Sequence, residues 1–346
     1  MSSQTKAIAS QLAAVDGLLR ADDLLRGVDH LVVGCSGGGD SIALVDILRQ
    51  LCPLVRLTLV HCDHQARPES AADAMFVGEY AASLGLECRV VRAPLPSSST
   101  GSREAGWRDL RRAAFRVAID DFDADAVALG HTADDQAETV LLNLARGSGL
   151  RGLAAMQSRV DHDGLIVVRP LLQMRRRALR HYGHARGLKW RRDASNDDIA
   201  FSRNRIRASI IPELEAIAPG AVANIARLAG IVREHERYLE AEAAAAWPRL
   251  ELGENFPGGV ALAGERLAAL PRPVAMETLR QAFRSVRGHL HGITKEHFDA
   301  VLDQVVTGRQ GAADIPGIRA RMDGDKLRLL PLHGRHLRGS DREQAS

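Results

Sequence analysis

One short segment constrains the fold of this chain more than any other. Residues 31–50 read LVVGCSGGGDSIALVDILRQ, which is an apolar run, three glycines and a second apolar run. Val32 and Val33 are β-branched residues of the kind that favours a buried parallel strand, whereas the apolar residues after Ser41 recur with helical spacing. Glycines between a strand and a helix present backbone N–H groups at the positive end of the helix, so the segment predicts an anion-binding loop.

Three kinds of glycine loop could occupy this position. A Walker A loop needs Lys-Ser or Lys-Thr at the start of the helix, but here the pair is Asp40-Ser41. A dinucleotide-binding loop would place its third glycine at Ile42. The pyrophosphate-loop pattern Ser-Gly-Gly-x-Asp-Ser instead matches at every fixed position. We therefore predict that ATP is bound by Ser36, Gly37, Gly38, Gly39, Asp40 and Ser41.

The aspartate of this loop predicts a metal ion. Asp40 would repel a bare triphosphate, so its presence indicates a bridging Mg²⁺. A glycine turn that merely connects a strand to a helix would leave the two serines and the aspartate unexplained. The loop thus predicts an enzyme that splits ATP between the α- and β-phosphates and activates its substrate as an adenylate.

The alternation of elements predicts the fold class. Further strands are expected at 55–64, 87–95, 126–131 and 165–172, with helices at 69–85, 103–122 and 133–147 between them. This order predicts an α/β fold with a doubly wound parallel five-stranded sheet, followed by a smaller, mainly helical C-terminal domain that ends in a hairpin turning at Asp323-Gly324. The expected division is a helical extension (1–29), a catalytic domain (30–215), a C-terminal domain (216–335) and a disordered tail (336–346).

Composition narrows the cellular setting. The 346 residues include four cysteines (35, 52, 62 and 88) without a C-x-x-C pair, which argues against zinc, iron–sulfur and disulfide frameworks. No apolar stretch approaches membrane-spanning length, and the N-terminus lacks a secretory pattern. We expect a cytoplasmic protein that does not bind a membrane. Its oligomeric state, a homodimer included, is left open.

Polar clusters follow the predicted strands at their carboxyl ends, where a doubly wound sheet binds its ligands. His61 to Arg67 follows the second strand, and HTADDQAET follows the fourth. In the latter, Asp135 and Glu138 are three residues apart and share a helical face, with His131 just before them. Helix capping explains one or two of the acids. The whole arrangement instead suits an ammonium group or Mg²⁺.

The charge distribution suggests a nucleic-acid partner. The net charge is only +3, but residues 169–207 contain twelve Arg or Lys against three acids. A basic block on an otherwise acidic chain is typical of nucleic-acid binding. For RRRALR at 175–180 taken alone, a solvated helical face is the preferred interpretation.

These motifs, taken together, resemble one family. SGGGDS, HCDHQAR, EAGWRDLRR, GHTADDQAETVLLNLARGSGLRGLAAM, RPLL and WRRDASNDDIAFSRNRIR occur in the order and spacing of the tRNA(Ile)-lysidine synthases, over roughly residues 30–212. The resemblance implies conversion of the wobble cytidine of a CAU-anticodon isoleucine tRNA to lysidine. ATP would adenylate the C2 oxygen of the base, and the ε-amine of free lysine would displace AMP.

The resemblance also implies roles for particular residues. Asp135 and Glu138 would bind lysine, and Asp40, His131 and Arg111 would be catalytic. The residues implied to contact tRNA are Arg67, Arg108, Arg203, Asn204, Arg205 and Arg207. Arg112 stands where the family usually has tyrosine. Whether a carboxylate or His131 takes the proton of the lysine amine is open.

Other functions remain to be compared with this one. A tRNA thiolase of the same superfamily would typically use paired cysteines, which this chain lacks. A small-molecule ligase would not need the basic block. A non-catalytic RNA-binding protein that uses ATP as a switch would not need Asp40, His131, Asp135 and Glu138 together.

Overall fold

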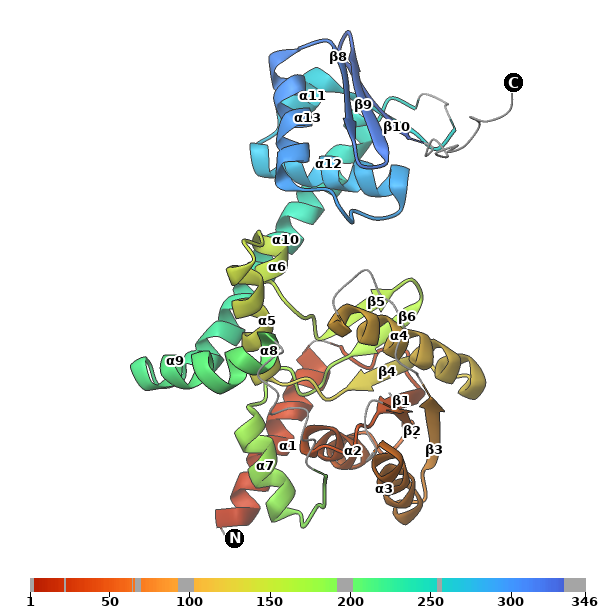
Figure 1. Ribbon diagram of the computed structural model, residues 1–346, viewed down its shortest axis with the longest axis vertical. Coiled ribbons are helices and arrows are strands. Elements are labelled where there is room, and N and C mark those ends of the chain that lie inside the picture. Colours follow the sequence, from red (N-terminus) through yellow and green to blue (C-terminus); the bar gives the residue numbers. More distant parts are fainter. Residues whose placement is uncertain are drawn as a thin grey trace, which may run out of the picture. The chain divides into compact units, whose positions relative to one another are not determined.

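The chain folds into two compact units, Met1–Arg233 and Glu234–Ser346 (Figure 1). The computed structural model describes residues 3–21, 23–63, 65, 70–92, 103–191, 202–253 and 257–332, apart from the side chains of 3–7, 21, 103–105 and 108. Predictions that concern Arg67, the tail, the side chain of Arg108 or residues 192–201 fall outside this description.

The first unit is built on a six-stranded sheet with the order β3-β2-β1-β4-β6-β5. Five of these strands are parallel, as predicted; the sixth, β5, pairs antiparallel with β6 and was not predicted. Its residues, RVDH, are mostly polar and partly exposed, so they lack the apolar run that predicts the parallel strands. The strands are β1 (His30–Gly34), β2 (Arg56–Asp63), β3 (Glu87–Arg92), β4 (Ala126–Leu129), β5 (Arg159–His162) and β6 (Leu165–Val168).

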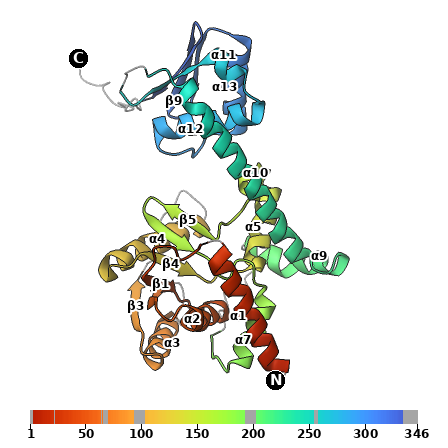
Figure 2. The ribbon, with the colours of Figure 1, turned by 180° about the vertical axis from the view of Figure 1, so that it is seen from behind.

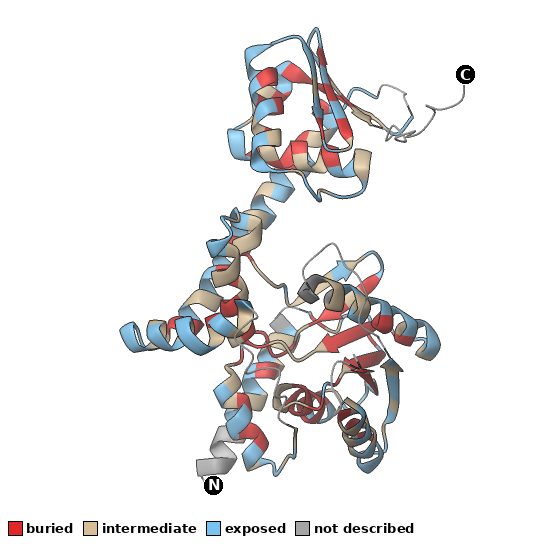
Figure 3. Cartoon of the chain, viewed as in Figure 1, coloured by how far each residue is buried: buried red, intermediate tan, exposed pale blue. Residues whose placement is uncertain are grey.

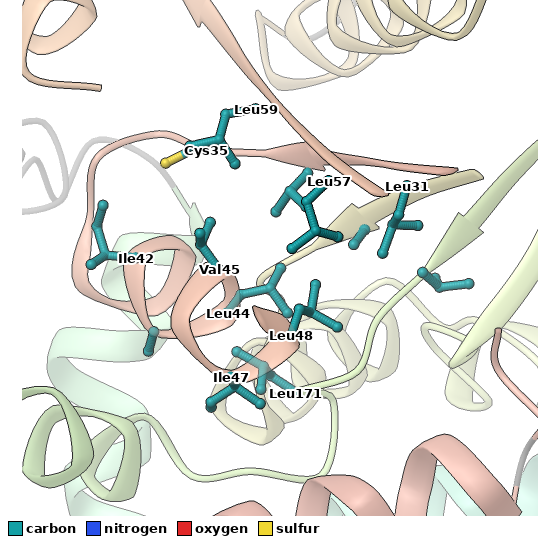
Figure 4. Packing of buried hydrophobic residues seen from close by; sticks show 14 of the residues in the cluster. Leu31, Cys35, Ile42, Leu44, Val45, Ile47, Leu48, Leu57, Leu59 and Leu171 are labelled. Carbon is teal, nitrogen blue, oxygen red and sulfur yellow. The ribbon is translucent and has the colours of Figure 1, made fainter. Parts of the chain in front are cut away.

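Helices cover both faces of this sheet, which confirms the doubly wound arrangement. Alternate residues of β1 point to opposite faces, so that Leu31 and Val33 pack against α2 while Val32 packs against α4. Figure 4 shows the α2 side of this core, where Leu44 and Leu48 face the strands. The buried residues concentrate in the central strands and α2 (Figure 3). The carboxyl ends of the central strands are therefore anchored by the buried core.

The helices of the first unit agree with the predicted ones and add several short elements. α7 lies beside α1 and α2 (Figures 1 and 2). Their bounds are α1 (Ser3–Ala21), α2 (Gly39–Leu51), α3 (Ser70–Ser83), α4 (Arg103–Phe122), α5 (Ala133–Ala145), α6 (Leu150–Leu153), α7 (Arg176–Ala185), α8 (Ser202–Arg205), the π-helical turn η2 (Ile206–Ile210), α9 (Ile211–Ile217) and α10 (Ala221–Leu250), which continues into the second unit.

The second unit has more β-structure than expected. The hairpin at Asp323-Gly324 is confirmed as β9 (Ile318–Asp323) and β10 (Lys326–Pro331), but β7 (Val260–Ala263) and β8 (Gly311–Ile315) extend it to a four-stranded antiparallel sheet. Helices α11 (Gly264–Ala268), α12 (Arg272–Arg287) and α13 (Lys295–Thr307) complete the unit. Its core contains the stacked rings of Phe283 and Phe298.

Within the described residues, no single helix is long and apolar enough to cross a membrane. One pair of consecutive helical segments, Ser202–Ile217 and Ala221–Leu250, meets the criterion by length and composition only, and it is bent by 96°.

Candidate active site

The phosphate loop connects the buried strand β1 to helix α2. Gly37 has φ +81°, a conformation that favours glycine, and Gly38 is the N-cap residue of α2. The Ser41 hydroxyl donates to the Gly38 carbonyl oxygen at 2.9 Å, and the Gly38 N–H donates to the Ser36 hydroxyl at 3.3 Å. Hydrogen bonds within the loop thus hold its conformation, and the N-terminus of α2 is a position that favours a bound anion.

The end of β4 lies against this loop because of a second glycine. A Cβ atom on Gly130 would lie 3.2 Å from the Asp40 carbonyl oxygen, which is closer than an ordinary contact. The missing side chain lets the segment after β4 approach the first turn of α2. The two polar clusters predicted from the sequence, SGGGDS and HTADDQAET, are therefore neighbours.

Two residues after α7 hold the loop from the other side. The Trp190 ring lies 3.5 Å from the position that a Cβ atom on Gly39 would take. The Arg191 N–H donates to the Gly37 carbonyl oxygen at 2.9 Å, and its guanidinium pairs with Asp73. These contacts fix the glycines of the loop without using the N–H groups that would face a phosphate.

Next to the loop lies a compact group of opposite charges, which we call the carboxylate–arginine cluster. It consists of Asp40, Asp135, Glu138, Arg176, Arg203 and Arg207. Arg176 lies at its centre: its Nε is 3.0 Å from Asp40, its Nη2 is 2.8 Å from Asp135 and its Nη1 is 3.4 Å from Glu138. One guanidinium therefore joins the phosphate loop to both carboxylates of α5.

Two further arginines close the cluster from the α8–η2 segment. Arg203 Nε and Arg207 Nε each lie 2.7 Å from a Glu138 oxygen. The Glu138 side chain has no exposed surface, whereas that of Asp135 is 11% exposed. Three carboxylates thus face three guanidinium groups, and the buried charges compensate each other.

Asp135 also caps its own helix. Its Oδ2 accepts hydrogen bonds from the Thr132 N–H at 2.8 Å and the Thr132 hydroxyl at 2.7 Å, and Thr132 caps α5 in return. Burial alone would raise the pKa of Asp135, but the charges of Arg176 and Arg203 outweigh it and hold the pKa well below the usual range. Asp135 is therefore ionised at neutral pH.

Asp40 behaves differently. Burial raises its pKa above the usual value, and the pairing with Arg176 only partly offsets this. A cation more highly charged than a guanidinium would stabilise the ionised form further. One carboxylate beside a phosphate loop is the donor set that Mg²⁺ uses together with substrate phosphates. No group of three metal-ligating side chains occurs among the described residues.

His131 follows β4 and lies at the edge of the same site. Its Nδ1 is 3.3 Å from the Nε of Arg169, the first residue after β6. Enclosure by the protein lowers the pKa of His131 to about 3; the attraction of Asp135 opposes this, and Arg169, Arg203 and Arg111 add to it. The imidazole is consequently neutral at physiological pH.

Comparison with known proteins agrees with this geometry. A family model for the PP-loop domain, an ATP-binding domain, matches residues 8–214. A tRNA(Ile)-lysidine synthase of Thermobifida fusca is 36% identical and covers 94% of this chain and 98% of the relative. That of Solibacter usitatus is 38% identical, covering 87% of this chain and 67% of the relative. The chain belongs to the tRNA(Ile)-lysidine synthase family.

A solved structure supports the fold. A U34-tRNA thiolase from Methanococcus maripaludis superimposes with a TM-score of 0.57 over 67% of this chain and 80% of the thiolase, at 20% identity. As a lysidine synthase family member with a PP-loop domain, the chain binds ATP.

The structure separates the residues that the sequence assigned to tRNA. Arg203 and Arg207 lie one helical turn apart and point into the carboxylate–arginine cluster, with 31% and 29% of their side chains exposed. Arg205 points elsewhere and is exposed, and Asn204 is half-buried. Arg111 is exposed on α4 and donates to the Trp107 carbonyl oxygen. Its positive charge contributes to the lowered pKa of His131.

The basic block is largely neutralised inside the protein. Six of its arginines pair with acids from other parts of the chain. These arginines are 175, 176, 186, 191, 203 and 207. The excess of positive charge in the sequence therefore overstates the charge that this segment offers to RNA.

Sequence reasoning missed Arg176, which it treated as part of a solvated helical face. One local signal was available. Arg175, Arg176 and Arg177 stand at the N-terminus of α7, where the helix dipole disfavours positive charge. Such a conflict between residue type and position indicates tertiary partners or function.

The ionisation of Asp135 makes stability depend on pH. Because its folded pKa is lowered, the stabilisation is present above the ordinary value near 4 and is lost as the pH falls below it. We expect the difference in unfolding free energy between the native chain and Asp135→Asn to be constant from pH 5 to 7 and to shrink below pH 4. Urea unfolding across this range would measure it; a difference that grew on acidification would contradict the assignment.

Proposed function

We propose that this protein joins free lysine to C2 of the wobble cytidine in a CAU-anticodon isoleucine tRNA. In the first step the C2 oxygen attacks the α-phosphate of ATP, and pyrophosphate leaves. In the second step the lysine ε-amine attacks C2, AMP leaves with the former C2 oxygen and the nitrogen loses a proton. The observation that carries the proposal is the position of Arg176, which joins the phosphate loop to the α5 carboxylates in a member of this family.

The proposed lysine site is the α5 end of the cluster. Of its two carboxylates only Asp135 retains exposed surface, so we assign it to the substrate ammonium. Glu138 is fully enclosed and holds Arg203 and Arg207 in place. The incoming ammonium would replace one contact that Arg176 makes with Asp135. With the ammonium bound, the carboxylate–arginine cluster would carry one excess positive charge.

The proposed Mg²⁺ site is Asp40 together with the phosphates of ATP. A bound Mg²⁺ would neutralise charge on the leaving pyrophosphate. Ser36, Ser41 and the loop N–H groups would bind and orient the phosphates. Arg111, whose charge contributes to the lowered pKa of His131, would act on the reacting groups, and Arg205 would contact RNA phosphates. We further propose that the protein acts in the cytoplasm.

The state of the cysteines argues against the alternative function, in which the enzyme would transfer sulfur instead of lysine. All four cysteines are free. Burial raises the pKa of Cys35 and of Cys62 to about 11 in each case, so neither is a thiolate at neutral pH.

The test combines purified protein, Mg-ATP, labelled lysine and a CAU-anticodon isoleucine tRNA transcript. The proposal requires lysine in the RNA with one AMP and one pyrophosphate for each lysine. AMP without lysine in the RNA would reject lysine as the nucleophile. RNA binding without AMP would indicate a protein that uses ATP only as a switch.

The assignment of Asp135 gives a specific prediction. Asp135→Asn keeps the shape of the side chain and an oxygen for Thr132 but loses the charge that would bind the ammonium. We expect lysine transfer at fixed lysine to fall about 10- to 100-fold while AMP-forming activation of the tRNA changes less than threefold.

The neighbouring carboxylate provides a matched control. Asp134 lies on the same helical turn but pairs with Arg175 and the Arg176 N–H. Asp134→Asn should leave the lysine concentration dependence unchanged. An equal loss of lysine affinity in both variants would reject the specific role of Asp135.

A further inference from the structure

Arg169 has no assigned role, yet it makes an unusual contact with His131. It follows β6 directly, and β6 is the parallel neighbour of β4, with Ala128 paired to Val168. The two residues therefore leave adjacent strands at the same edge of the sheet. Arg169 Nε lies 3.3 Å from His131 Nδ1.

The direction of this hydrogen bond follows from the chemistry of arginine. Burial lowers the pKa of Arg169 to about 10, with Arg233 and Arg112 adding repulsion, so the guanidinium is still protonated at neutral pH. It has five N–H donors and no acceptor. His131 Nδ1 must therefore contribute its lone pair, and the ring proton of the neutral imidazole must be on Nε2.

Arg169 is itself held in place. Its Nη1 donates to the Gln157 carbonyl oxygen at 2.7 Å, and its backbone N–H donates to the Ser158 carbonyl oxygen at 2.7 Å. In the part of the chain that the structure describes, it forms no ion pair with a carboxylate. Among the described residues, the guanidinium thus contacts one backbone carbonyl oxygen and His131 but no carboxylate, and it is available to orient the imidazole.

The charges around His131 act in the same direction. Asp135 on α5 attracts the imidazolium, whereas the positive charges of Arg169, which follows β6, of Arg203 on α8 and of Arg111 on α4 act against it. Three positive charges against one negative charge oppose a second ring proton.

We propose that Arg169 is a positioning residue that fixes His131 as a neutral imidazole with its proton on Nε2. His131 then donates a hydrogen bond from Nε2 to an oxygen of the reacting groups, either the cytidine C2 oxygen or an α-phosphate oxygen. It cannot take the proton of the lysine amine, because Nδ1 is occupied and Nε2 already carries a proton. The role of His131 in catalysis rests on the proposed function, but its tautomer does not.

The tautomer is measured directly by histidine ¹⁵N NMR on the full chain without substrate, with His131→Gln used to assign the signal among the 13 histidines. In the native chain we expect a proton on Nε2 and no titration of His131 between pH 5 and 8. A proton on Nδ1, or a titration within this range, would overturn the proposal.

Two variants separate positioning from a structural role. Arg169→Met should give a mixture of tautomers and a His131 titration that moves up toward its ordinary range, whereas Arg169→Lys keeps a donor and should restore the single tautomer in part. The rate at which Arg169→Met activates tRNA should be about 10- to 100-fold lower than that of the native chain. This rate should also decrease further as the pH is lowered, because His131 then becomes protonated. Unchanged NMR signals in Arg169→Met would refute the role of Arg169. If the NMR result is as expected but the native chain incorporates no lysine, the proposed function is rejected and the tautomer of His131 is not.

Discussion

Replacement of Asp40 by asparagine is expected to abolish tRNA activation, with AMP formation reduced at least about 1000-fold, or about 4 kcal/mol. Asparagine keeps the shape of the side chain and an oxygen for Arg176 Nε, but it removes the charge beside the phosphates. Since Arg176 retains Asp135 and Glu138, the variant should fold. Rapid-quench measurement of AMP with saturating tRNA, together with a filter-binding assay, would separate catalysis from RNA binding.

Asp46 on the same helix provides the control. It is buried and also pairs with an arginine, Arg186, at 3.0 Å, and it accepts a hydrogen bond from Tyr182, but neither of these partners belongs to the carboxylate–arginine cluster. Asp46→Asn should lower stability and spare the rate of AMP formation below its unfolding temperature. Simultaneous loss of activity and tRNA binding in Asp40→Asn would show that the loop has another role.

Glu138→Gln is expected to have the largest effect on stability, about 3–5 kcal/mol, because it leaves buried arginines without compensation. Glu138 has no exposed surface and contacts Arg176, Arg203 and Arg207. The melting temperature of the first unit should fall by about 6–20 °C. Calorimetry would measure this change, and the second unit, which has its own core, should melt as before.

A second substitution tests the electrostatic origin of this loss. Arg203→Met removes one of the positive charges that Glu138 compensates, so the double variant Glu138→Gln/Arg203→Met should be less destabilised than the sum of the single variants. Additive losses would mean that the cluster is not held by mutual compensation. A loss below about 1 kcal/mol for Glu138→Gln alone would lead to the same conclusion.

The cluster also shows why a charge count along the sequence was misleading. Arg176 and Asp40 are separated by 136 positions, and Arg203 and Glu138 by 65. Except for Glu215 on α9, the acids that neutralise the basic block lie on α2, α3 and α5, at least 30 positions before it in the sequence. Net charge in a sequence window describes a surface only when no distant segment folds onto it.

The amino-acid sequence by itself determined the features that depend on local chemistry. Glycines 37–39 between an apolar strand and an apolar helix specify the phosphate loop, because backbone conformation and helix dipole act within a few residues. Apolar runs between helical patterns predicted the five parallel strands, and the Asp323-Gly324 pair predicted the hairpin. The strands β5 (RVDH) and β8 (GAADI) lack such an apolar run, and the four-residue strand β7 was also missed.

The tertiary structure alone decided which charges meet. α7 packs against α2 and α1, and this brings Arg176 to Asp40 and to both carboxylates of α5. The adjacency of β4 and β6 likewise brings Arg169 to His131 and thereby fixes the ring proton on Nε2. Ion pairs and tautomers depend on distances of a few ångströms between distant segments, so they follow from packing and not from any local pattern.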